Sequence, residues 1–170
     1  MKIIKKYNQK NIIKRIKAFT YGNDIKPEIS GIYIDKEKGV IVATDSHKLV
    51  ELSYITGMET GIYNLDTLQK IDGSYPDYKQ IFYPISEATE TENTTVEKLN
   101  NYVTTCAMEN IAGTSTIKYF DKNFNKDSLI QAVELFQAIL ANDIIITYKE
   151  NKPLIFKSDQ CTILIMTMRS

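Results

Sequence analysis

The chain has 170 residues, of which 43% are hydrophobic and 25% are charged, and its formal net charge is zero. This composition is typical of a soluble globular protein with enough apolar side chains for one core, so we expect a single domain over residues 1–170. No apolar run approaches the roughly 20 residues that span a bilayer, and the basic N-terminus lacks the apolar segment of a signal peptide. The sequence therefore predicts no membrane association. The two cysteines, Cys106 and Cys161, are far apart and fit a reducing, cytoplasmic location.

The charge is unevenly distributed along the chain. The first seventeen residues contain no acidic side chain, and the rest of the chain is net negative. A basic face can bind nucleic acid even when the whole chain is neutral. The alternative is an ordinary solvated helix face. The basic residues of this segment are Lys2, Lys5, Lys6, Lys10, Lys14, Arg15 and Lys17.

The N-terminal third predicts one helix and several strands. Residues 1–8 alternate weakly and suggest a first strand, and Asn8 is a plausible N-cap for a helix over residues 8–20. That helix places its isoleucines and Phe19 on one side and Lys10, Lys14 and Lys17 on the other. Residues 21–28 predict a loop. Residues 31–55 predict a strand, a polar turn, a second strand and a further strand.

The rest of the chain predicts a less regular middle and a regular C-terminal part. Residues 60–71 suggest a strand and a helical turn, and residues 72–84 suggest a turn-rich connector. Residues 86–101 are acidic and polar, which predicts a mobile loop with a short helix near its end. Residues 114–121 predict a strand, and residues 124–140 predict a helix capped by Asn125. Residues 142–159 predict a hairpin, and residues 161–169 predict an apolar strand in which Cys161 is a buried thiol.

The two ends of the chain share one order of elements. Residues 1–55 predict strand, helix, hairpin and strand, and residues 114–169 predict the same order. Two such units, with half-domains at about 1–75 and 85–170, can pair their sheets edge to edge with both helices on one face. The predicted fold class is therefore α+β with an antiparallel sheet.

Motifs for catalysis and for cofactor binding are absent from the sequence. The sequence contains no HExxH, phosphate loop, GxSxG or EF-hand loop. One histidine and two distant cysteines make a zinc site improbable. A pair formed by His47 and a cysteine, or by Asp45 and Asp77, stays open because spacing alone does not exclude it. We expect a binding protein without a cofactor rather than an enzyme.

The chain contains four segments, VATDSHKL, SYPDYKQIFYP, FNKDSLIQAVELF and LIMTMRS, that resemble motifs of the bacterial sliding-clamp family, the DNA polymerase III beta subunits. The segment VATDSHKL at residues 42–49 resembles the family pattern ATDGHRL, and SYPDYKQIFYP at residues 74–84 resembles FPDYRRVIP. The segment FNKDSLIQAVELF resembles the last clamp helix, of the type NPEYLLDAL, and the terminal LIMTMRS resembles VVMPMRL. The segments occur in family order. Their spacing is shorter than in the family, as if the chain kept the first half of the middle domain and the second half of the last.

The resemblance implies a ring that encircles duplex DNA and binds polymerase or repair proteins through a linear peptide. It implies that helices line the hole, so Lys10, Lys14, Arg15 and Lys17 would contact DNA phosphates without sequence preference. It also implies a hydrophobic peptide pocket whose soft leucine and methionine side chains adapt to different partners. The residues assigned to this pocket are Thr44, Ser46, His47, Lys48, Leu49, Pro76, Ile81, Leu164, Met166, Thr167, Met168 and Arg169.

Other interpretations stay open at this stage. Met166 and Met168 fit a core as well as a pocket, and His47 fits a turn cap. Ser46 and Thr167 stand where the family has glycine and proline, which can reshape the pocket. A ring of single-domain chains would need several copies joined head-to-tail. The alternative function is a peptide-binding module that captures clamp-binding proteins without encircling DNA, and no motif supports an enzyme with a clamp-like fold.

Overall fold

The computed structural model describes residues 9–22, 26–54, 56–109 and 113–168. The strand expected at residues 1–8 and the N-cap expected at Asn8 lie outside the described residues, as does Arg169. Within the described part, no helix is long and apolar enough to cross a membrane.

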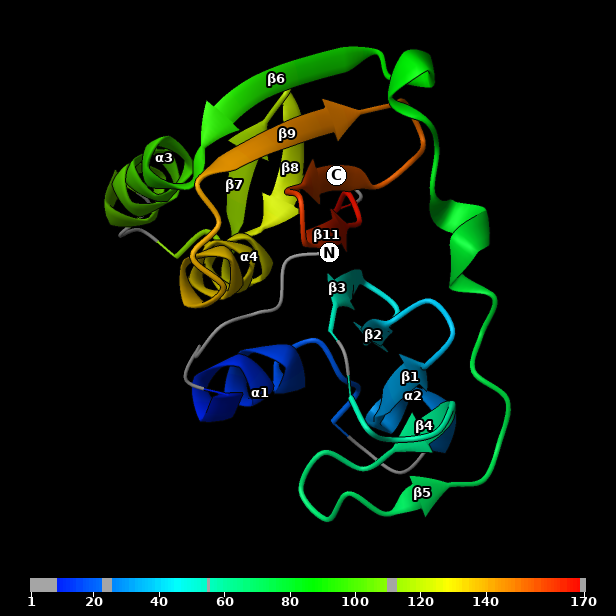
Figure 1. The fold of residues 1–170 in the computed structure, drawn as a ribbon. Helices are drawn as coiled ribbons and strands as arrows, with labels where there is room; N and C mark the ends of the chain where they lie inside the picture. Colours follow the sequence, from blue (N-terminus) through cyan, green and yellow to red (C-terminus); the bar gives the residue numbers. More distant parts are fainter. Residues whose placement is uncertain (1–8, 23–25, 55, 110–112, 169–170) are drawn as a thin grey trace.

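A nine-stranded antiparallel sheet organises the described part of the chain (Figure 1). Its order is β5-β4-β1-β2-β3-β11-β10-β9-β6. The centre is the pairing of β3 with β11, in which Leu49 lies opposite Leu164, and this pairing joins the two halves of the chain. The strand bounds are β1 Ile32–Asp35, β2 Val40–Thr44, β3 Lys48–Ser53, β4 Gly61–Tyr63, β5 Lys70–Ile71, β6 Glu90–Thr95, β9 Asp143–Tyr148, β10 Leu154–Lys157 and β11 Cys161–Ile165.

Three helices cover one face of this sheet, and they are α1 Gln9–Lys17, α3 Val96–Glu109 and α4 Lys126–Ala138. Helix α4 begins after Asn125, whose side chain accepts a hydrogen bond from the Ser128 N–H at 2.9 Å and so caps the first turn. The predicted Asn125 cap is therefore confirmed, as is the α+β class with helices on one face.

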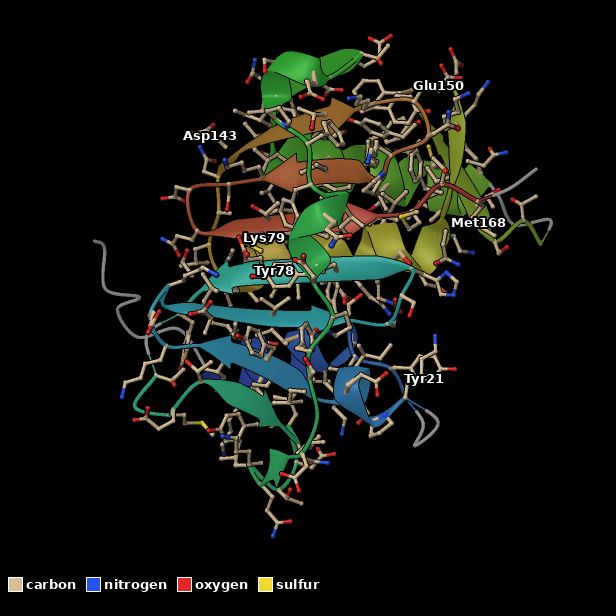
Figure 2. All side chains as sticks on the ribbon, turned by 90° about the vertical axis from the view of Figure 1, so that its right-hand side faces the viewer. Tyr21, Tyr78, Lys79, Asp143, Glu150 and Met168 are labelled. Carbon is tan, nitrogen blue, oxygen red and sulfur yellow. The ribbon has the colours of Figure 1, made fainter. Side chains whose placement is uncertain are left out.

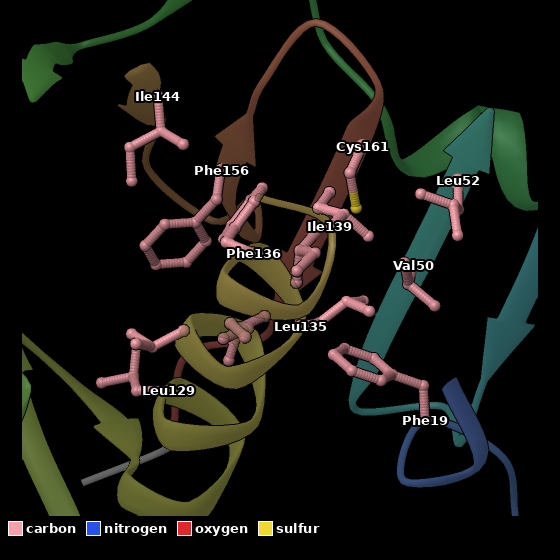
Figure 3. Packing of buried hydrophobic residues seen from close by; sticks show 14 of the residues in the cluster. Phe19, Val50, Leu52, Leu129, Leu135, Phe136, Ile139, Ile144, Phe156 and Cys161 are labelled. Carbon is pink, nitrogen blue, oxygen red and sulfur yellow. The ribbon is translucent and has the colours of Figure 1, made fainter. Parts of the chain in front are cut away.

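The main core fills the space between α4 and the sheet. Leu135 and Phe136 of α4, and Ile139 directly after it, point toward the strands that carry Phe156 and Cys161 (Figure 3). Close packing of these rings and branched chains gives most of the hydrophobic stabilisation, since each buried apolar side chain contributes roughly 1.5–3 kcal/mol. The prediction of a buried Cys161 thiol is confirmed, because the residue is 2% exposed on β11.

One sequence-based prediction is wrong in the middle of the chain. Residues 86–101 do not form a mobile loop, because they contain strand β6 and the start of the fourteen-residue helix α3. The helix buries Val96, Leu99 and Val103, which are three and four residues apart. The strand lies at the sheet edge and has no buried residue, so its sequence carries no alternating apolar pattern.

The C-terminal unit also differs from the predicted order. The strand expected at residues 114–121 is β7, Thr116–Tyr119, but it pairs only with β8, Lys122–Asn125, in a separate two-stranded sheet. Helix α4 therefore begins two residues later than predicted. A short helix, α2 Pro27–Ser30, also begins within the last two residues of the loop expected at residues 21–28.

Residues 72–89 form a strap across the sheet face that lacks helices (Figure 2). The strap contains two single-turn 3-10 helices, η1 Tyr78–Ile81 and η2 Ile85–Glu87. Tyr83 anchors it by donating its O–H to the Thr147 carbonyl at 2.9 Å and lying near the Pro153 carbonyl at 3.2 Å. Tyr75 stacks on Tyr33 with ring centroids 5.0 Å apart. The strap thus forms a second, smaller core on the outer face.

Candidate functional site

A surface pocket of about 370 Å³ opens where the β2–β3 turn, the end of β11, the strap and α2 meet. Its floor is apolar, with Leu49 and Leu164 buried beneath it and Met166 41% exposed at its edge. Apolar concave sites with a few polar groups at the rim are the usual form of a ligand site. The lining residues are Lys26, Glu28, Ile29, Thr44, Ser46, His47, Lys48, Leu49, Pro76, Asp77, Tyr78, Ile81, Leu164 and Met166.

The β2–β3 turn is shaped by the side chains of Asp45 and Thr44. One Asp45 carboxylate oxygen accepts the N–H groups of His47 and Lys48, both at 2.9 Å. Thr44 Oγ1 accepts the Ser46 N–H at 3.2 Å and donates to the Lys48 carbonyl at 2.8 Å. These local bonds hold Ser46 at φ 78°, the left-handed region in which the family pattern has glycine.

Lys48 is held under the turn rather than projected into solvent. Its ammonium lies 2.8 Å from the second carboxylate oxygen of Asp45, and its side chain is only 10% exposed. The same ammonium lies 5.8 Å from the centroid of the Phe19 ring, within reach of a cation–π attraction. Lys48 therefore stabilises the pocket wall through the aliphatic part of its side chain and through its ion pair with Asp45.

The C-terminal segment closes the pocket from the opposite side. The Met166 N–H donates to the His47 carbonyl at 2.9 Å, which continues the β3–β11 pairing beyond the strand. Thr167 then pairs with Phe124 of β8, and the Met168 N–H donates to the Asn123 carbonyl at 2.9 Å. After Met166 the chain therefore turns away from the pocket toward the small sheet, and Figure 2 shows Met168 at the end of the molecule.

The strap supplies the third wall. The Tyr78 hydroxyl donates to a Glu51 carboxylate oxygen at 2.8 Å, and Lys79 pairs with the same oxygen at 2.5 Å. Burial raises the pKa of the Tyr78 hydroxyl above its usual value, and the bond to Glu51 adds to the shift. Tyr78 thus stays neutral and bonded to β3 over the physiological pH range.

The structure brings together nine of the twelve residues that the sequence assigned to a peptide pocket. Thr167 and Met168 lie beside the pocket, on the segment that pairs with β8, and do not line it. Arg169 is outside the described residues. The nine that line it are Thr44, Ser46, His47, Lys48, Leu49, Pro76, Ile81, Leu164 and Met166.

Sequence reasoning missed five lining residues. Asp77 and Tyr78 lie between Pro76 and Ile81 in the segment that resembles a clamp motif, so their position in the sequence could have predicted that they line the pocket. Lys26, Glu28 and Ile29 come from the α2 region, which no motif marked. They reach the pocket only because the chain before β1 folds back toward the β2–β3 turn.

The predicted DNA-contacting residues divide into two pairs. Arg15 forms an ion pair with Glu134 of α4, and Lys17 forms one with Asp66 at 2.7 Å. Lys10 and Lys14 are exposed on α1 and form no ion pair with another described residue. The helix face of the described molecule therefore has fewer available cations than the sequence alone suggests.

Among the described residues, no group of three or more His, Cys, Asp and Glu side chains is placed to hold a metal ion. Burial raises the pKa of the Cys161 thiol well above its usual value, so this thiol is poorly suited as a nucleophile. Asp45 is engaged with Lys48, and Asp77 accepts a hydrogen bond from Gln80 at 2.9 Å. The pocket therefore offers binding chemistry from its apolar floor and polar rim.

Comparison with solved structures identifies the fold. A putative DNA polymerase III beta subunit from Eubacterium rectale superposes with a TM-score of 0.75 at 13% identity, and the match covers 95% of this chain and 63% of that one. The sliding clamp of Bacillus subtilis gives 0.73 at 10% identity, covering 95% and 62%. The Helicobacter pylori beta clamp, solved with a DNA ligase peptide, gives 0.69 at 16% identity, covering 94% and 62%. No protein-family model and no curated protein matches the chain.

The chain has the fold of the bacterial DNA polymerase III beta sliding clamps, as the four sequence segments predicted. It covers less than two thirds of the length of each of these clamp chains.

Proposed function

We propose that this chain is a reduced clamp-like protein that binds short linear peptides of polymerase or repair proteins. The observation that carries the proposal is the pocket between the β2–β3 turn, the end of β11 and the strap, three segments far apart in the sequence. The H. pylori clamp of the same fold is bound to a DNA ligase peptide. The apolar floor suits aliphatic or aromatic side chains, and the exposed His47 at the rim suits the peptide's polar atoms.

A substitution at the pocket edge tests this proposal. Met166→Asp places a charge where an apolar side chain of the peptide would be desolvated, so we expect at least about a tenfold loss of affinity. The probe is a fluorescent peptide with the ligase sequence bound by the H. pylori clamp, and the measurement is fluorescence anisotropy. Met108→Asp is the matched control, because Met108 is 65% exposed on α3 and lies outside the pocket. Equal affinity of the wild type and Met166→Asp would refute the pocket assignment.

We also propose that copies of the chain, each acting as one clamp-like domain, join head-to-tail into a ring around duplex DNA. The support is the fold, together with Lys10 and Lys14 on the helix face. Two unpaired cations on the described part of α1 give weak contacts in each copy, so the affinity depends on many copies acting together. We place the protein in the cytoplasm and assign it no enzymatic step and no cofactor.

One observation favours the second candidate, a peptide-capturing module that does not encircle DNA. The ion pairs Arg15–Glu134 and Lys17–Asp66 neutralise half of the predicted DNA-contacting charge within the chain itself. A module of this kind would bind the ligase peptide as a monomer or dimer and would be indifferent to DNA. Light scattering across a concentration series separates the candidates, because a ring requires a discrete higher assembly.

A further inference from the structure

The two edge strands of the nine-stranded sheet, β6 and β5, differ in length and in how open they are to pairing with another chain. Edge strand β6 pairs with β9 over six consecutive residues without a bulge, and the described residues of β6 include no lysine or proline. Such an edge is open to pairing with another chain, because bulges, lysines and prolines are the usual protection. The opposite edge strand, β5, has only two residues, so an extended backbone ladder cannot form there. Contacts at that edge must come mainly from side chains.

A leucine projects from the β5 end. Leu68 lies in the turn between β4 and β5, is 56% exposed and has a positive φ of 56°. Residues other than glycine rarely adopt this conformation, so the surrounding structure holds Leu68 in it. The turn is held by the Leu68 N–H donating to the Asn64 carbonyl at 2.8 Å and is tied to α1 by the Lys17–Asp66 ion pair. This end therefore presents an apolar side chain on a fixed turn.

An aromatic pocket lies beside β6 at the other end. It has a volume of about 320 Å³ and is lined by Glu92, Thr94, Lys98, Leu99, Tyr102, Tyr119 and Phe120. Tyr119 packs edge-to-face on Tyr102 and Phe120, with centroids 5.4 and 4.9 Å away. Phe120 also has a positive φ, 44°, and its ring lies 6.3 Å from that of Tyr148. The hairpin turn thus places a strained phenylalanine at the rim of this pocket.

The two edge strands carry opposite charges, because β6 contains glutamates and no basic residue whereas β5 contains Lys70 and no acidic residue. Glu90, Glu92 and Glu97 lie on β6 and the start of α3, where Lys98 is the one basic side chain of these described elements. At the other end, Lys70 lies on β5, with Lys10 and Lys14 on α1. A two-fold pairing of β6 with its own copy would bring the glutamates of both chains together, which is unfavourable. A head-to-tail contact brings acidic and basic ends together.

We infer that Leu68 of one copy inserts into the Tyr102–Tyr119–Phe120 pocket of the next copy, beside β6. This inference rests on the ring part of the proposed function and names the partner surface for it. The leucine supplies the apolar anchor, the aromatic pocket desolvates it, and the charged ends orient the two chains.

Light scattering on the full chain tests the inference with a matched pair of variants. Leu68→Asp should raise the concentration needed for half-assembly at least about tenfold. Ile13→Asp is the control, because Ile13 is an aliphatic residue 42% exposed on α1 that lies neither in the β4–β5 turn nor in the aromatic pocket. Phe120→Leu keeps an apolar side chain against the core, where Phe120 also packs, but removes the ring from the pocket, so it should weaken assembly while its far-UV circular dichroism stays that of the wild type.

Cross-linking identifies the contact directly. A chain with Leu68→Cys, Phe120→Cys and Cys106→Ser should form intermolecular disulfide ladders on mild oxidation, and either cysteine alone should give dimers at most. If the wild type assembles, Leu68→Asp assembles equally well and no disulfide ladder forms, the inferred contact is wrong but the proposed ring still stands. A wild type that stays monomeric at every concentration would overturn both the inference and the ring, and the ligase-peptide measurement would still decide the pocket.

Discussion

Ser46 carries a positive φ of 78° in the turn that forms one wall of the pocket. Glycine reaches this conformation without the steric cost that serine has, although glycine also loses more chain entropy on folding. We therefore expect Ser46→Gly to raise the free energy of unfolding by about 0.5–1 kcal/mol in urea titrations. Ser53→Gly is the control, because Ser53 is an exposed residue of β3, where glycine destabilises a strand. A loss of stability in Ser46→Gly would contradict the argument.

Asp35 gives the fold an acid-sensitive turn between β1 and β2. Its carboxylate accepts the Lys38 N–H at 3.1 Å and pairs with the Lys38 ammonium at 2.9 Å, and these bonds lower the pKa of Asp35 below its usual 3.8. As the pH falls below about 4, the unfolded chain binds a proton at Asp35 more readily than the folded chain does. The stabilisation that the Asp35–Lys38 bonds give the folded state is therefore complete above that pH and is lost below it. Asp35→Asn should flatten the loss of unfolding free energy between pH 5 and pH 2, relative to the wild type. Identical pH profiles would exclude this role.

Helix α4 begins at a side-chain N-cap, Asn125. Asn125 satisfies the Ser128 N–H at 2.9 Å at the start of the helix that fills the core. Removing such a cap costs about 1 kcal/mol, so Asn125→Ala should lower the free energy of unfolding by that amount. Asn101→Ala is the matched control, because Asn101 is exposed within α3, where alanine has the higher helix propensity. Thermal unfolding that shifts equally in both variants would refute the capping role.

The proposed ring places the helix face against duplex DNA. Lys10 and Lys14 are the two α1 cations without an ion pair to another described residue, so the double variant Lys10→Glu and Lys14→Glu should abolish association with duplex DNA. The control carries the same charge change at Lys152 and Lys157, which lie on the β9–β10 turn and on β10. The measurement is a DNA pull-down at 50 and 200 mM salt. Equal retention of both double variants would reject the ring around DNA.

Local signals in the sequence predicted some parts of the fold and missed others. The strands around Val42 and Leu164 and the helix around Phe136 have strong apolar patterns, and the structure confirms them. Strand β6 was missed because an exposed edge strand has no buried face to impose alternation. The sequence predicts a strand at residues 114–121 but not β8 after it, because the turn residues Phe120 and Asp121 are not the usual asparagine and glycine of a hairpin.

By itself, the sequence determined the order of its strong elements and, through four segments, the clamp fold and nine residues of the pocket. Short-range patterns carry this information because buried periodicity and turn chemistry depend on near neighbours. Only the tertiary structure decided that Lys26, Glu28 and Ile29 complete the pocket, and that Thr167 and Met168 leave it for β8. It also decided that Glu134 and Asp66 neutralise two cations of α1. These partners are distant in the chain, and only the antiparallel sheet and its packed helices bring them together.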